Sequence, residues 1–155
     1  MFDTISGLPV HVLVVHAVVV LLPLMSVVTL AVAARPQWRQ NAPWVVVVDA
    51  VVVVLALVAK ESGEKLQARL QKLDPTVADQ HSKDARLVPY LAIAVFVAAV
   101  LVWAAQRIPG IVPLAVAVAL VAGVGGVWWT YVTGESGARA VWGNTVKNTK
   151  PPQGG

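Results

Sequence analysis

The sequence contains no cysteine, and charged residues make up only 13% of its 155 residues. Without cysteine the chain can form no disulfide, no covalent c-type haem attachment and no cysteine-ligated iron–sulfur cluster. Hydrophobic residues make up 57% of the chain and its mean hydropathy is +0.72, so the composition lies outside the range of ordinary soluble domains. The composition excludes a water-soluble monomer and predicts an integral membrane protein.

Long uncharged runs are the main signal in the sequence. About 20 apolar residues are needed for a helix to cross about 30 Å of hydrocarbon. Four runs approach or exceed this length, at residues 8–34, 44–59, 87–105 and 111–133. We therefore predict an all-α four-helix membrane bundle with both termini on one side. Residues 1–149 would form a single domain, and residues 150–155 a disordered tail.

The loops between these runs differ in length and composition. Residues 35–43 and 106–110 are short and contain proline, as tight reversals do. Between the second and third runs, leucines from Leu66 to Leu73 continue at helical spacing, and Asp74-Pro75 is typical of a helix N-terminus. This pattern predicts that helices two and three extend beyond the bilayer as a helical hairpin.

The basic residues indicate lipid as the nearest charged partner. The net charge is +4, and the basic side chains lie beside runs of spanning length, which favours anionic lipid over nucleic acid. Nine Lys or Arg lie in the hairpin and after Glu135, against three in the short loops, which favours cytoplasmic termini. The first run favours the opposite orientation, because basic residues follow it and none precedes it.

The ends of helices two and four share a short motif. Glu61-Ser62-Gly63 follows the second run, and Glu135-Ser136-Gly137 follows the fourth. His16 and His81 lie near the starts of helices one and three, each followed by proline seven or eight residues later. These matches predict two helical hairpins related as a weak internal repeat.

Histidines on the hairpin side are the main candidates for chemistry. Ionisable residues within spans are functional candidates, and imidazole binds haem iron, zinc and copper. Haem b would require two facing axial ligands, namely His81 with either His16 or His11. A metal site would combine His16 with Glu61 and Glu135. His16 has two further interpretations, a neutral histidine bonded to a backbone carbonyl and a proton relay with Glu61.

Two further features of the spans predict packing. Asp49 is the one charged residue inside the second run, at the depth of Ser26 and Thr29, and a hydrogen bond to threonine would join helices one and two. Small residues recur on helix four, which predicts close helix packing there: Ala119, Ala122, Gly123 and Gly126.

Several of these motifs together resemble a known family. They are Gly7-Leu8-Pro9-Val10-His11, Val15-His16-Ala17, Glu61–Glu64, His81 with Arg86–Tyr90, and Gly134–Arg139 with Val141-Trp142. The chain resembles the predicted bacterial membrane proteins of domain-of-unknown-function family 2231. That resemblance implies a four-helix domain in a bacterial inner membrane. Some members are joined to Rieske-type or cytochrome-type modules, which implies a redox setting. Many members carry proline and histidine where this chain has Val12 and Glu135.

Two functional hypotheses follow from the sequence. The first is a small redox-associated subunit that binds haem or a divalent metal near His16, with a redox membrane protein or a second copy as partner. The second is a non-catalytic structural or partner-binding subunit that uses the hairpin and the small-residue face of helix four. The sequence contains no phosphate loop, nucleophile elbow or paired catalytic carboxylates, so enzymatic activity is not indicated.

Overall fold

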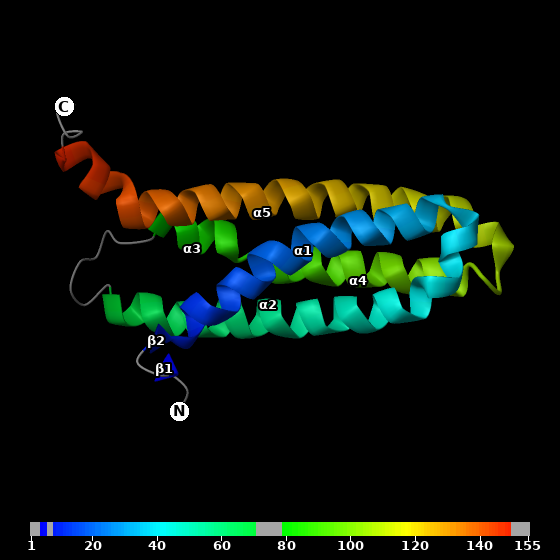
Figure 1. Ribbon diagram of the computed structural model, residues 1–155, viewed down its shortest axis with the longest axis horizontal. Coiled ribbons are helices and arrows are strands. Elements are labelled where there is room, and N and C mark those ends of the chain that lie inside the picture. The colour runs from blue at the N-terminus through cyan, green and yellow to red at the C-terminus, as the bar shows by residue number, and fades with distance from the viewer. Residues whose placement is uncertain (1–3, 6–7, 71–78, 150–155) are drawn as a thin grey trace, which may run out of the picture.

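The chain folds into long parallel and antiparallel helices in a computed structural model that describes residues 4–5, 8–70 and 79–149 (Figure 1). The α-helices are α1 Val10–Ala34, α2 Ala42–Leu70, α3 Asp79–Ala85, α4 Val88–Ala104 and α5 Val112–Asn148. Two short 3-10 helices, η1 Pro36–Asn41 and η2 Pro109–Ile111, form the tight reversals. Strands β1 Thr4–Ile5 and β2 Leu8–Pro9 pair as an antiparallel hairpin before α1.

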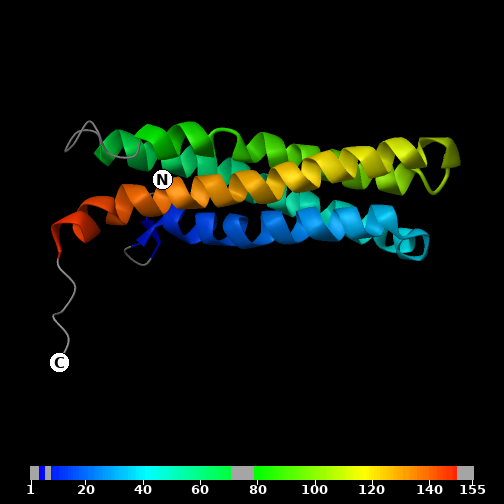
Figure 2. The same ribbon diagram turned by 90° about the horizontal axis from the view of Figure 1, so that it is seen from above.

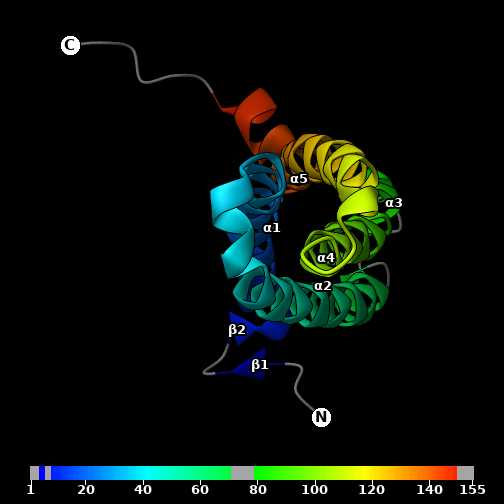
Figure 3. The same ribbon diagram turned by 90° about the vertical axis from the view of Figure 1, so that its right-hand side faces the viewer.

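Four of these segments are long and apolar enough to cross a membrane: residues 10–34, 36–69, 80–104 and 109–143. Helix α1 packs against α2 and α5, and α4 packs against the same two helices, so α1 and α4 lie diagonally across the bundle. Figure 3, an end-on view, shows the helices arranged as a ring, and Figure 2 shows them running along one axis. The prediction of an all-α four-helix membrane bundle is confirmed.

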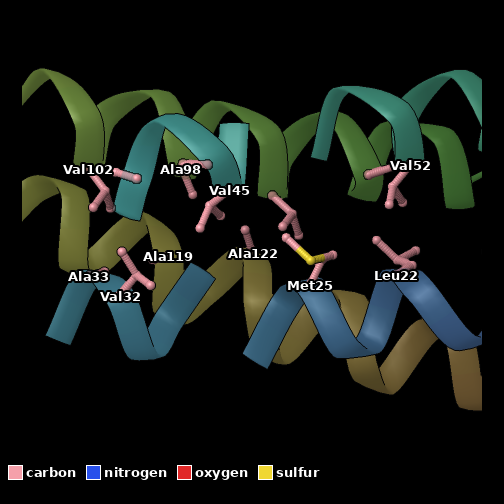
Figure 4. Packing of buried hydrophobic residues seen from close by; sticks show 14 of the residues in the cluster. Leu22, Met25, Val32, Ala33, Val45, Val52, Ala98, Val102, Ala119 and Ala122 are labelled. Carbon is pink, nitrogen blue, oxygen red and sulfur yellow. The ribbon is translucent and has the colours of Figure 1, made fainter. Parts of the chain in front are cut away.

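The bundle buries small side chains and exposes large ones. Its core consists mainly of valine and alanine from all four long helices, with Leu22 and Met25 among the few larger residues (Figure 4). Large apolar side chains lie outside, and Val121 and Trp44 are 74% and 73% exposed. Lipid removes the penalty for that exposure, and small residues let helix backbones approach closely. The exposed surface therefore fits a bilayer.

Helices α1 and α5 approach each other closely at two glycines of α5. A Cβ atom added to Gly123 would lie 3.1 Å from the backbone oxygen of Ser26, and one added to Gly126 would lie 2.5 Å from the Ser26 hydroxyl oxygen. Ala119 and Ala122, on the same face of α5, are also buried. The small-residue face predicted on helix four therefore packs within the chain, and it is not free to bind a partner.

The third predicted helix differs from expectation. It consists of two helices, α3 and α4, separated by a turn at Arg86-Leu87. Pro89 has no N–H to donate to the carbonyl of Ala85, and it disfavours helical geometry at Val88. The third helix is therefore interrupted at this turn, although residues 80–104 together make one candidate span, and its extension beyond the bilayer stays a prediction. Helix α2 does continue unbroken past Lys60 to Leu70, whereas the predicted Asp74-Pro75 helix start and the tail at 150–155 lie outside the described residues.

Aromatic side chains lie toward both ends of the bundle. Trp38, Trp44 and Trp103 lie toward the end that holds the two reversals, and Tyr90, Trp128 and Tyr131 belong to the other half. All six are exposed. Tryptophan and tyrosine concentrate at membrane–water interfaces, so this distribution agrees with a bundle whose axis runs across the bilayer.

One polar contact joins α1 to α2 inside the core. The Thr29 hydroxyl donates to a carboxyl oxygen of Asp49 at 2.9 Å, and Asp49 is only 2% exposed. A carboxyl group in this position is costly without a hydrogen-bond partner. The predicted Asp49–threonine contact is confirmed.

We expect Thr29→Val to destabilise the protein by about 1–3 kcal/mol, because it leaves the Asp49 carboxyl without its hydroxyl donor. Asp49→Asn should have nearly the same stability as the parent, since the asparagine side-chain oxygen still accepts the hydrogen bond from the Thr29 hydroxyl. The measurement is thermal unfolding of purified protein in mild detergent. Equal stability of Thr29→Val and the parent would contradict the role given to this bond.

The bundle also predicts a labelling pattern. Because the chain has no cysteine, single cysteines at Lys65 and Arg139 should react with a membrane-impermeant maleimide from one side of the membrane. A cysteine at Gln40, in the first reversal, should react from the opposite side. Labelling of Lys65 and Arg139 from opposite sides would rule out four spans.

Candidate functional site

A cavity lies at the end of the bundle that is opposite the two short reversals. Its volume is about 140 Å³, and it opens between the helices. A water molecule has a share of about 30 Å³ in the liquid, so the cavity has room for about four or five water molecules. The wall is mostly apolar, with polar side chains from α1, α2, α3 and α5 and from the turn before α4: His11, Lys60, Glu64, Gln67, His81, Ser82, Arg86, Thr130 and Thr133.

His11 enters this cavity from the first turn of α1. Its Nδ1 lies 2.9 Å from the backbone oxygen of Ala59 on α2. A Cβ atom added to Gly63 would lie 2.9 Å from Cε1 of the ring, so only glycine accommodates the ring in this position. Because a carbonyl oxygen can only accept, Nδ1 carries the proton and donates. In the neutral imidazole, Nε2 therefore keeps a free lone pair.

His81 repeats this arrangement on α3. Its Nδ1 lies 3.2 Å from the backbone oxygen of Thr133 on α5 and 3.4 Å from the hydroxyl of Ser136. A Cβ atom on Gly137 would lie 3.1 Å from Cε1 of the ring. The same tautomer follows, with the lone pair on Nε2. In each case the histidine ring packs on a glycine of another helix, and its Nδ1 donates to the backbone oxygen of the residue four positions before that glycine. We call this arrangement a His–Gly contact.

The two His–Gly contacts use the Glu-Ser-Gly motifs found in the sequence. In each motif the serine hydroxyl donates to the carbonyl that the histidine also uses, Ser62 to Ala59 at 3.1 Å and Ser136 to Thr133 at 3.0 Å. The sequence pattern paired His16 with His81, whereas these contacts pair His11 with His81. The glycines of the two motifs, Gly63 and Gly137, were the signal for these contacts, since each glycine leaves room for a histidine ring from another helix.

The structure does not bring His16, Glu61 and Glu135 together. His16 is exposed, and its Nδ1 donates to the carbonyl of Val12 in its own helix. Glu61 forms an exposed ion pair with Lys65 at 3.5 Å, and Glu135 pairs with Arg139. Within residues 4–5, 8–70 and 79–149, no group of three His, Asp or Glu side chains could hold one metal ion. The candidate site is therefore centred on His11 and His81.

Charged and amide side chains surround the opening. Lys60 pairs with Glu64 at 3.0 Å, and Arg86 also lines the cavity. The side-chain amide of Gln67 donates to the Ser82 hydroxyl at 3.1 Å, which links α2 to α3. Counting residues from the short loops places Gln67 at the depth of His11 and His81, and Arg86 belongs to a family motif, but the sequence assigned neither residue a role in a site.

Both His81 and Asp84 join α3 to α5. The contacts of His81 with Thr133 and Ser136 are described above. At Asp84, the backbone oxygen accepts a bond of 2.8 Å from the indole N–H of Trp129. Thr133 is 6% exposed, and its hydroxyl has no hydrogen-bond partner among the described residues. The cavity wall therefore includes an unsatisfied hydroxyl as well as two imidazole lone pairs.

Comparison with known proteins assigns the family. Residues 7–150 match the model of a family described as predicted membrane protein, DUF2231. The match covers nearly the whole chain, including both His–Gly contacts. Searches of curated proteins and of solved structures found no match.

We expect Gly63→Ala and Gly137→Ala each to destabilise the protein by about 1–3 kcal/mol, because the added methyl group displaces a histidine ring. Gly134→Ala is the matched control: it lies in the same helix as Gly137, and nothing lies within 4 Å of its added Cβ. It should be neutral or stabilising, since alanine is the better helix former. Thermal unfolding of the three variants in one detergent tests this order.

Proposed function

The chain belongs to the DUF2231 family of predicted membrane proteins, and we propose that it is a small redox-associated subunit that holds haem b between His11 and His81. The observation that carries this proposal is the pair of His–Gly contacts. The two rings come from α1 and α3, belong to one cavity, and each keep Nε2 free because Nδ1 is bonded to a carbonyl.

The donor set favours haem over a metal ion held by side chains alone. Protein zinc sites use three or four side-chain ligands, and no such group exists among the described residues. Haem iron needs only two axial ligands from the protein, because the macrocycle supplies the other four. In helical bundles such ligands come from facing helices. Helix α3 leads directly into α4, the diagonal neighbour of α1.

The remaining residues of the cavity suit an amphiphilic guest. The mostly apolar wall, with Val15, Val18 and Val88, would contact the macrocycle, and the helices around the cavity would have to move apart because haem is larger than the cavity of about 140 Å³. Lys60 and Arg86 at the opening could pair with carboxylates, and a charge-assisted contact of this kind is stronger than a neutral one. When bound, haem supplies one-electron redox chemistry, and the protein supplies position and surroundings.

The backbone carbonyls would determine how the two imidazoles act. A hydrogen bond from Nδ1–H to a carbonyl fixes the tautomer, orients the ring and makes Nε2 a better donor to a metal. Ser62 and Ser136 share those carbonyls, and Gly63 and Gly137 leave the space that the rings occupy. The chain would therefore hold both ligands in position before any cofactor binds.

The setting that we propose is the bacterial inner membrane, with the termini and the cavity on the cytoplasmic side. The distribution of basic residues, nine on that side against three in the reversals, supports this orientation. A cavity at the membrane surface would let a redox membrane protein, or a second copy of the chain, exchange electrons with the site.

We expect purified protein titrated with haemin to develop a Soret band of a low-spin, bis-histidine type at one equivalent. His11→Ala and His81→Ala should each lose that spectrum, because each removes one axial ligand. His16→Ala is the matched control, since its ring is exposed and bonded within its own helix, and it should bind haem like the parent. No Soret shift in the parent, or equal loss in His16→Ala, would overturn the proposal.

One observation favours a second candidate, a non-catalytic structural subunit. The same Nδ1 bonds join α1 to α2 and α3 to α5, so both histidines could serve only to fasten helices. In that case the protein would stay colourless with haemin, and His11→Ala and His81→Ala would still lower the unfolding temperature. The spectrum and the unfolding temperature together distinguish the two functions.

A further inference from the structure

The last turns of α5 expose large apolar side chains beyond the bundle. Helix α5 has 37 residues, so at 1.5 Å per residue it is about 55 Å long, against about 30 Å of hydrocarbon. Val141, Trp142 and Val146 are 66%, 61% and 67% exposed. Exposure of these apolar side chains to water is unfavourable. The question is therefore what surrounds them.

Trp142 and Val146 lie on the lipid-facing side of α5, and Val141 borders that side about 100° around the helix from Trp142. At 100° per residue, Trp142 and Val146 lie within about 40° of Val124 around the helix, as do Trp128 and Tyr131. Val124, Trp128 and Tyr131 are exposed on a segment that spans the membrane. The Glu135–Arg139 ion pair lies on the same side of the helix between Tyr131 and Trp142. The apolar residues of the last turns therefore return on the lipid-facing side after one charged turn.

The direction of the last turns is consistent with contact to the membrane surface. The C-terminal end of α5, coloured red, bends away from the bundle axis and outward from the ring of helices (Figures 1 and 3). Gly134, Gly137 and Gly143 lie within or next to this part of the helix, and glycine lowers the cost of bending a helix. The segment thus leans over the lipid beside the bundle and not over the cavity.

We propose that residues 138–146 of α5 form an interfacial anchor, which lies in the headgroup layer of the membrane that the same chain spans. Its apolar side, with Val141, Trp142 and Val146, faces the hydrocarbon. Trp142 lies at the depth that tryptophan prefers, and the Glu135–Arg139 ion pair, with both side chains exposed, lies at headgroup level. This inference is independent of the haem proposal.

Lipid explains these residues better than a second protein chain does. The apolar side contains only a few large residues, on the same side of α5 as the lipid-facing Val124 and Trp128, whereas stable protein interfaces bury about 800 Å² on each partner. An amphipathic helix at the interface requires only one apolar side and a tryptophan at the boundary. The occupant that we assign is therefore the lipid headgroup and upper acyl region.

The test uses the absence of cysteine in the natural sequence. Single cysteines at Val141 and Val146 receive a nitroxide spin label, and Ala140→Cys is the matched control on the other side of the same exposed turns. The full-length protein is placed in vesicles of phosphatidylcholine with phosphatidylglycerol. Collision rates are then measured with oxygen, which concentrates in lipid, and with a water-soluble nickel chelate.

We expect labels at Val141 and Val146 to collide at least several-fold more often with oxygen than with the nickel chelate, and the label at Ala140 to show the reverse. Equal collision rates at Val146 and Ala140 would overturn the anchor. Protection of Val146 from both reagents would also overturn it, because that result indicates a protein partner. Neither outcome depends on whether haem binds.

Discussion

Close approach of helices over small side chains is the constraint on which the rest of this structure depends. In a bilayer, large apolar side chains are as stable in contact with lipid as they are in a protein core. Association of the helices with one another is therefore driven by packing and by hydrogen bonds between helices. Ala98 and Ala119 are almost fully buried, while Val121 and Trp44 face outward. The glycines at 123 and 126 let α5 approach Ser26 on α1, and this approach sets the spacing of the bundle.

The same spacing controls the polar groups. Where backbones lie close, a side chain from one helix can reach a carbonyl or a carboxyl group on the next, as Thr29 reaches Asp49 and as His11 reaches Ala59. Each such bond satisfies a group that would be costly in hydrocarbon. Glycine is required where the side chain is a ring, which is why Gly63 and Gly137 lie at the two histidines.

The spans were predictable from sequence, because long uncharged runs form helices in a membrane. The Asp49 contact was predictable because a lone carboxyl group in a span needs a hydrogen-bond partner. The break at Arg86-Leu87 was readable in principle from Pro89. The sequence left open whether His16 or His11 pairs with His81, since the spacing gives each histidine's direction around its own helix but not the rotation of that helix against its neighbours. His16 lies nearer the middle of the membrane by residue count, yet its ring faces outward.

The two ends of the bundle differ in a way that bears on function. At the reversals, the side chain of Arg39 donates to the carbonyl of Ala33, and Gln106 donates to the carbonyl of Arg39 at 2.7 Å, so carbonyls at that end are satisfied within the chain. At the opposite end, the unsatisfied Thr133 hydroxyl and two imidazole lone pairs remain among the described residues. Polar groups without partners in a mostly apolar cavity have free energy to gain from a guest. The site proposed for haem therefore lies at the end of the bundle that lacks tight reversals.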